Sequence, residues 1–381
     1  MKVSNSFVRI TLTIILSVLQ TACNQSKATI TKIQVNMEKA ISAEVEDVFS
    51  HISYLAIELP DSIYFGNIEH IKSSGKYLFL HDLQQTESIT VIDTLGNFIN
   101  QLKRKGRGPS EYMDMESFAF DKNQNELIIN DRTLKQFQFY SFPDLEHVRT
   151  ARKNQYITNF EILDDDHWLV ISDESNEKME YAGLEIWDRE LDLLYRPKNI
   201  NNDISSIEIS YPNTITNIGS VVLYANLGEI TTIFEINGQQ QIEKYGIDFG
   251  KNKILNQVYS GRIDAQNFET VFEELPHKAT WGQNVLIHDP YLSFWNMYRD
   301  FETFYFSVYN TSNNKSVVYS DLKFRDSEVK LPRPIGMVDG KYISYLYPDE
   351  IESIRHENKY LKSAIKKNNG SETPILIIFK L

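Results

Sequence analysis

Short apolar segments that end in Asp or Asn recur along the chain and divide it into units of similar length. Six segments have this form: YLFLHD ending at Asp82, ELIIND at Asp131, WLVISD at Asp173, VVLYAN at Asn226, NVLIHD at Asp289 and YISYLYPD at Asp349. Their ends are 49, 42, 53, 63 and 60 residues apart. Runs of β-branched and aromatic residues favour strands, and this period is typical of repeats that each form one four-stranded sheet.

Further strand-like runs flank these segments. Ser88–Asp93 is followed by a glycine-containing turn and then by Phe98–Leu102, and Thr231–Ile236 precedes the dipeptide Asn237-Gly238. Such turn residues between apolar runs are hairpin signals. Another apolar run, such as Ile68–Ser73, precedes several of the segments. Six units of four strands predict an all-β fold, a six-bladed β-propeller with four-stranded blades.

The last unit is one strand short. After Asp349 we expect one helical insertion over Glu350–Lys367, and then a third strand over Pro374–Leu381. The N-terminal run His51–Leu59 should supply the missing fourth strand, because a ring closed in this way leaves no bare edge. A buried stripe is expected on the helical insertion, formed by Ile351, Ile354, Leu361 and Ile365.

The N-terminus has the pattern of an export signal. Lys2 and Arg9 precede or border an apolar stretch, Ile10–Leu19, which is too short to span a bilayer. Cys23 is the only cysteine of the chain and follows two small residues. The sequence around it resembles a bacterial lipobox, although Gln20 stands where an aliphatic residue is usual. We therefore predict lipid attachment at Cys23; simple secretion with a chance cysteine is the alternative.

This pattern sets the expected domain organisation. Residues 1–22 form a signal peptide, 23–50 a lipid-anchored tether and 51–381 the six-bladed propeller. The expected location is the cell envelope, as an outer-membrane lipoprotein that faces the periplasm or the cell surface.

One stretch resembles a known family. Residues 93–131 read DTLGNFINQLKRKGRGPSEYMDMESFAFDKNQNELIIND, and they contain the loop GRGPSEY from Gly106 to Tyr112. This loop is similar to the G-x-G-P-G-E-Y loop of the six-bladed β-propeller lipoproteins of gut anaerobes, which are distantly NHL-repeat-like. Here Ser110 replaces a glycine of that pattern. The resemblance implies the fold and an envelope location, and it brings no activity or catalytic residues.

The charge balance bears on the partners. The chain has a formal net charge of −13. Loss of residues 1–22 would remove two cations and no acid, which takes the charge to −15. Nucleic-acid binding needs clustered Lys and Arg, so we expect no nucleic-acid partner. The expected partners are the membrane, through lipidated Cys23, and a glycan, peptide or protein ligand; the protein is expected to be a monomer.

Motifs for catalysis are mostly missing from the sequence. The eight histidines show no HxxH or HExxH spacing, and no GxSxG, Walker or GxGxxG motif occurs. The recurring Asp has a simple explanation, since Asp and Asn favour turns. We expect no metal, no cofactor and no enzymatic activity. The alternative is a propeller enzyme of lactonase, lyase or glycosidase type, with its site at the central channel.

The long connections indicate a candidate ligand-binding face. Chain direction alternates in a blade, so the expected connections 103–115, 290–301 and 350–373 should share one face, and binding residues favour such loops. The candidate residues are Arg104, Arg107, Glu111, Tyr112, Tyr291 and Trp295. Two alternatives remain open: the first four form a structural corner, and the two aromatic residues pack in the core.

The predicted function is that of an exported lipoprotein propeller acting as a binding or scaffold module at the cell envelope. The anchor can be tested directly. Cys23→Ala should release the protein from membrane fractions, because the attached acyl chains are what hold it there. Fractionation and radiolabelled fatty acid measure this. Failure of the wild-type protein to incorporate the label would contradict lipid attachment.

Overall fold

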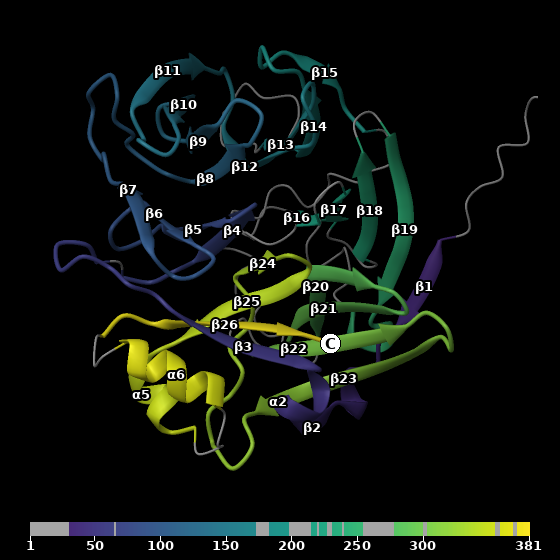
Figure 1. Cartoon of the computed structure of the whole chain (residues 1–381). Helices are drawn as coiled ribbons and strands as arrows, with labels where there is room; N and C mark the ends of the chain where they lie inside the picture. Colours follow the sequence, from purple (N-terminus) through teal and green to yellow (C-terminus); the bar gives the residue numbers. More distant parts are fainter. Residues whose placement is uncertain are drawn as a thin grey trace, which may run out of the picture. The chain divides into compact units, whose positions relative to one another are not determined.

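The computed structural model describes residues 30–64, 66–172, 183–197, 215–218, 221–226, 231–237, 240–253, 278–299, 303–354, 359–368 and 372–381. Strands dominate this part of the chain and form five sheets (Figure 1). The prediction of an all-β protein is confirmed.

Four of the sheets each contain a run of four consecutive antiparallel strands. The first two comprise β8 (Ser117–Asp121), β9 (Glu126–Asp131), β10 (Gln136–Ser141) and β11 (His147–Arg152), then β12 (Ile157–Ile162), β13 (Trp168–Ser172), β14 (Gly183–Trp187) and β15 (Leu193–Tyr195). The next two comprise β16 (Ile215–Ile218), β17 (Val221–Asn226), β18 (Thr231–Asn237) and β19 (Gln240–Asp248), then β20 (Ala279–His288), β21 (Tyr291–Tyr298), β22 (Phe304–Asn310) and β23 (Lys315–Lys323).

The fifth sheet has eight strands in the order β3-β26-β25-β24-β4-β5-β6-β7. Their bounds are β3 (His51–Ala56), β4 (His70–Ser74), β5 (Tyr77–Asp82), β6 (Ser88–Asp93), β7 (Phe98–Leu102), β24 (Gly336–Val338), β25 (Lys341–Leu346) and β26 (Ile375–Lys380). Two antiparallel sets of four meet where β24 and β4 pair in parallel through Gly336 and Ile71. A Cβ atom on Gly336 would lie 1.9 Å from the Ile71 carbonyl oxygen, so this close approach requires glycine. The structure therefore contains five sheets and not the six separate ones that we predicted.

The strand sets are arranged like the blades of a propeller. The first strand of each set, β4, β8, β12, β16, β20 or β24, lies toward a common middle (Figure 1). Among the described residues, six apolar clusters fill the spaces between successive sets. Each cluster takes side chains from two neighbouring sets, as in the pairs Phe79 and Phe118, Phe139 and Trp168, Leu169 and Val222, Leu223 and Phe294, Trp295 and Phe379, and Leu376 and Leu80. The fold is therefore propeller-like and all-β.

The N-terminal segment is part of this folded unit. β1 (Thr31–Gln34) extends the sheet of β19, and β2 (Ile41–Glu44) pairs in parallel with β23; the short helices η1 (Met37–Lys39) and α2 (Val45–Val48) follow these strands. The compact unit begins at Lys32. Five side chains of the segment are buried: Ile33, Val35, Met37, Val45 and Phe49. The assignment of residues up to 50 to a tether is corrected here, because this apolar pattern anchors 31–50 to the outer strands.

The predicted pairing of the two chain ends is present. β26 and β3 pair antiparallel, from Ile375 opposite Ala56 to Lys380 opposite His51. The order β3-β26-β25-β24 makes β3 the fourth strand of the last set, as the strand count required.

The helical insertion differs in part from the prediction. It consists of α5 (Pro348–Glu352) and α6 (Lys359–Asn368) in place of one helix. Ile351, Ile354 and Leu361 are buried as expected, whereas Ile365 is exposed on the outer side of α6. Among the residues that the structure describes, no helix is long and apolar enough to cross a membrane.

The strand prediction was wrong in one unit. The recurring segment is the second strand of its set in β5, β9, β13, β17 and β25, but NVLIHD lies in β20, the first strand. The expected loop 290–301 is largely the strand β21. The reason is that its residues YLSFWNMY are nearly all buried between sheets, and aromatic residues favour such strands.

Removal of the C-terminal strand should abolish cooperative folding. Ile375, Leu376, Ile377 and Phe379 are all buried, and truncation of one such side chain typically costs about 2–5 kcal/mol. Losing all four would cost about 8–20 kcal/mol, which is comparable to or larger than the roughly 5–15 kcal/mol that stabilises a protein. We expect a chain that ends at residue 374 to lose its thermal transition in calorimetry, while a chain that starts at residue 30 keeps it. An unchanged melting temperature after the C-terminal deletion would contradict the closure.

Candidate functional site

Two of the recurring Asp residues hold turns. The Asp82 carboxylate accepts hydrogen bonds from the backbone N–H of Gly66 (2.6 Å) and of Gln85 (2.9 Å), and from the Thr86 hydroxyl (2.8 Å). The Asp131 carboxylate accepts from the backbone N–H of Leu134 at 2.9 Å, which closes the turn after β9. The turn explanation is confirmed for these two residues. Asp173 and the side chain of Asn226 lie outside the described part of the chain, and Asp289 is exposed.

The loop between β7 and β8 is built around a buried tyrosine. Tyr112 is fully buried. Its hydroxyl donates to the Glu87 carbonyl oxygen (2.6 Å) and accepts from the Arg104 backbone N–H (3.0 Å). The backbone of Tyr112 also accepts from the Gly106 N–H at 2.9 Å. Tyr112 is therefore an internal support of the loop and not part of an accessible surface.

Glu111 is folded back under the same loop. Its carboxylate accepts from the Gly108 backbone N–H at 2.7 Å. A Cβ atom on Gly106 would lie 2.0 Å from the nearer carboxylate oxygen. The Glu111 carbonyl oxygen accepts from the side-chain amide of Gln138 at 2.8 Å, which ties the loop to β10. These contacts fit the structural-corner interpretation.

Most cations of this loop already have partners. The Arg104 guanidinium lies 3.3 Å from the Glu146 carboxylate. Lys105 is paired with Glu87, and the Lys103 ammonium lies 4.8 Å from the centre of the Tyr64 ring. Arg107 is exposed. A ligand-binding role for the cations of this loop would therefore rest mainly on Arg107.

The two aromatic candidates lie on β21, in a different sheet from the loop. Tyr291 is the first residue of the strand and is exposed, whereas Trp295 is buried. The Trp295 ring packs 5.0 Å from that of Phe306, centre to centre. Core packing, the alternative interpretation, therefore describes Trp295. The sequence prediction placed both residues in a loop, and only Tyr291 is accessible.

An ion pair joins two sheets near the middle of the molecule. The Lys72 ammonium on β4 lies 2.7 Å from the Glu161 carboxylate on β12 and 5.3 Å from the centre of the Phe118 ring. Burial, together with the charge of Lys72, lowers the pKa of the neighbouring His81 to about 4. His81 is therefore neutral at pH 7. Among the described residues no group of three metal-binding side chains occurs.

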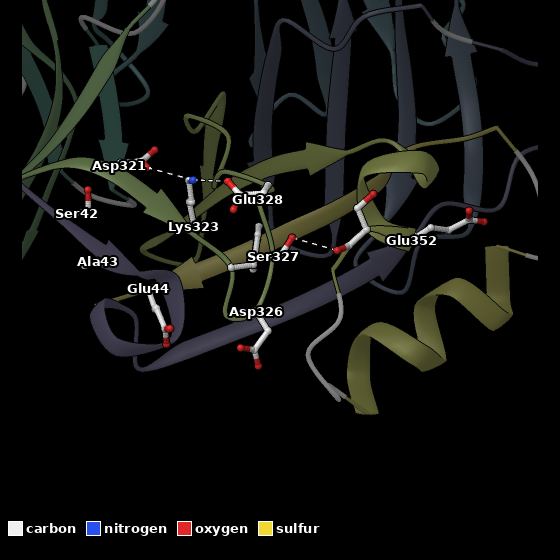
Figure 2. Close-up of a pocket in the computed structure, with 11 residues that line it drawn as sticks. Ser42, Ala43, Glu44, Asp321, Lys323, Asp326, Ser327, Glu328 and Glu352 are labelled. Carbon is white, nitrogen blue, oxygen red and sulfur yellow. Dashed lines mark hydrogen bonds and ion pairs between the residues drawn. The ribbon is translucent and has the colours of Figure 1, made fainter.

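A groove of about 880 Å³ lies elsewhere, where the N-terminal segment meets β23 and α5 (Figure 2). Its walls are formed by β2, the end of β23, the turn that follows and the end of α5. The lining residues are Ser42, Ala43, Glu44, Asp321, Lys323, Phe324, Asp326, Ser327, Glu328, Glu352 and Ser353. Five of these carry a carboxylate and one carries an ammonium group, so the groove is acidic.

Ion pairs hold the walls of the groove together. Lys323 lies between Asp321, at 3.8 Å, and Glu328 (Figure 2). Arg325, at the turn, pairs with Glu44 on β2 and with Asp47 on α2. The turn thus clamps the N-terminal segment in place.

Two carboxylates of the groove remain available to a ligand. In the part of the chain that the structure describes, no ion pair engages Asp326 or Glu352, and both residues are exposed at the groove. A cationic group in the groove would be attracted to both. Sequence reasoning missed this site because one wall is β2, which lay in the assumed tether; the acidic run Glu44–Asp47 was the available signal.

These features define an all-β protein with a propeller-like arrangement of sheets. The chain belongs to the family described as a domain of unknown function, DUF4934, whose profile matches residues 28–380. No protein with a curated description matches the chain.

Two solved structures are similar to it. One is a Bacteroides fragilis protein whose name describes it as an inferred exported protein. It has a TM-score of 0.73 and 18% sequence identity, over 93% of this chain and 99% of its own. A member of the duf4221 family from Bacteroides vulgatus has a TM-score of 0.47 and 10% identity, over 87% of this chain and 97% of its own. At 18% identity the first similarity concerns the fold alone.

Tyr112→Phe should destabilise the protein by about 1–3 kcal/mol, because two partly buried backbone groups, the Glu87 carbonyl and the Arg104 N–H, lose their partner. Urea unfolding followed by fluorescence would measure this. Tyr64→Phe is the matched control, since the Tyr64 side chain is 65% exposed, and it should change stability little. Equal unfolding midpoints for wild type and Tyr112→Phe would mean that the hydroxyl does not hold the loop.

Proposed function

We propose that the protein is a six-bladed β-propeller that acts as a lipid-anchored binding module at the cell envelope. The blade count is supported by the packing. The eight-stranded sheet consists of two four-stranded sets that share one parallel pair, and six apolar clusters join six successive sets. Counted in this way, the eight-stranded sheet consists of the first blade and the last blade, which are joined side by side through β4 and β24.

Export and lipid attachment are supported by the N-terminal pattern and by the position of the folded unit. The first paired strand, β1, begins at Thr31, so a chain attached to lipid at Cys23 would have residues 23–30 as its tether. A segment of that length spans at most about 30 Å when fully extended. The lipoprotein resemblance and the NHL-like character remain part of this proposal, and one structural neighbour is named as exported.

The acidic groove is the observation that carries the binding function. It is an open concave surface built from β2, β23, the turn after β23 and α5, and its walls are joined by the Arg325 and Lys323 ion pairs. Rigid walls lower the entropy that a ligand must lose on binding. The rim carboxylates Asp326 and Glu352 favour a cationic ligand. We infer that the ligand is a basic segment of a peptide or protein.

The enzyme alternative has less support. It needed carboxylates that converge on the middle of the propeller, and Asp82 and Asp131 instead accept backbone N–H groups in turns. A catalytic acid or base with a tuned pKa is expected beside a cleft. The acidic groove is a cleft, but three of its five carboxylates, Glu44, Asp321 and Glu328, are held in ion pairs.

Binding of a fluorescent peptide of alternating Lys and Ser tests the groove. The double variant Asp326→Asn with Glu352→Gln should bind about tenfold more weakly, since two exposed ion pairs of roughly 0.5–1 kcal/mol each are lost. Fluorescence anisotropy gives the Kd, and binding should weaken with added salt.

The matched control is Asp144→Asn with Glu190→Gln, which removes the same two charges from exposed turns of two other sheets. It should bind like the wild type. An equal loss of peptide affinity in this control would mean that the weaker binding comes from the change in net charge and not from the groove. No salt-sensitive binding by the wild-type chain would contradict the groove as a site for basic peptides.

A further inference from the structure

A surface around α6 combines exposed apolar and cationic side chains. Its apolar members are Leu95, Tyr360 and Ile365, which are 67%, 56% and 38% exposed. Its exposed cations are Lys76, Lys362 and Lys366. Leu95 lies in the turn between β6 and β7, and the other residues lie on α6 or beside that turn. We call this set the α6 surface.

The pieces of this surface are held together by defined contacts. The Lys367 ammonium donates to the Leu95 carbonyl oxygen at 2.9 Å and lies 3.0 Å from the Glu58 carboxylate. The turn is fixed in its place because the Glu58 N–H donates to the Gly96 carbonyl oxygen at 2.8 Å. The Thr94 N–H donates to the Lys76 carbonyl oxygen at 2.9 Å, which brings Lys76 to the same turn.

The orientation of α6 is set by its apolar side. Leu361 and Ala364 are buried, and the helix packs on β3 and β26. Successive residues of a helix are rotated by about 100°, so Lys362 and Lys366 point away from that buried side. Tyr360 and Ile365 flank them on either side. The outer face of α6 is therefore a lysine ridge with an apolar residue at each edge.

We infer that the α6 surface rests against a bilayer that contains anionic lipid. The positive charge of these lysines is complementary to the negative charge of the lipid headgroups. The lysines are gathered on this helix although the chain as a whole has a formal net charge of −13. Lysine stems and tyrosine rings suit the boundary between lipid headgroups and acyl chains. Each lysine near an anionic membrane surface adds to the attraction. This inference is independent of the acidic groove and of its ligand.

A lipid-free protein separates this contact from the acyl anchor. The chain from residue 24 onward keeps the compact unit Lys32–Leu381 and has no cysteine. We expect it to co-sediment with phosphatidylcholine vesicles that contain about 30% phosphatidylglycerol, and not with pure phosphatidylcholine. Binding should be lost in about 1 M salt, where charges are screened beyond about 3 Å.

A double variant tests the lysine ridge. Lys362→Gln with Lys366→Gln should lower the vesicle partition coefficient by about tenfold or more, because each lysine contributes several-fold. Lys122→Gln with Lys315→Gln makes the same charge change at exposed positions of two other sheets, in the turn after β8 and at the start of β23, and should lower it much less. Melting temperatures confirm that both variants fold.

A fluorescent label locates the contact. With Leu95→Cys as the one cysteine, an environment-sensitive dye should shift to the blue on anionic vesicles. The same dye at Val148→Cys should not shift, since Val148 is 50% exposed on β11, in another sheet. Three results would overturn the inference: no binding to anionic vesicles, an equal loss in the control double variant, or an equal shift at both labels.

Discussion

The constraint on which this structure depends is that every set of strands must bury both of its faces. Neighbouring residues of one strand enter different apolar clusters, as Leu169 does with respect to Trp168 on β13, and Trp295 with respect to Phe294 on β21. A sheet that is apolar on both faces can be stable only between two neighbours. The series of sets must then close on itself, or two large apolar faces would remain in water.

Closure explains what the chain does at its ends. The last set lacks a strand until β3 joins β26, so that the first and last parts of the folded chain depend on each other. Before it reaches that position, the N-terminal segment adds β1 to β19 and β2 to β23. Outer strands are the exposed edges of such sheets and invite unwanted pairing. The first part of the folded chain therefore covers two outer edges with β1 and β2 and then closes the last set with β3.

Sequence alone was sufficient for the features that follow from local patterns. Apolar runs that end in Asp predicted the strands, and the strand count predicted the role of His51–Leu59. Sequence reasoning failed where burial on both faces of a strand removes the alternation of apolar and polar residues. For this reason YLSFWNMY, from Tyr291 to Tyr298, was interpreted as a loop with aromatic residues. The segment 31–50 was missed because Ile33, Val35 and Met37 alternate with polar residues over only a few positions. The partners of such a short strand are far away in sequence.

The same packing determines where recognition chemistry can lie. Side chains between the sets are buried in the core, as Trp295 and Tyr112 are, and cannot contact a ligand. The recurring carboxylates Asp82 and Asp131 are consumed by turns. The two surfaces proposed for recognition are formed largely by additions outside the repeating pattern. The acidic groove is built from β2, a turn and α5, and the lysine ridge lies on α6. Because these additions do not repeat, a search for the repeat finds the scaffold and passes over the surfaces that it carries.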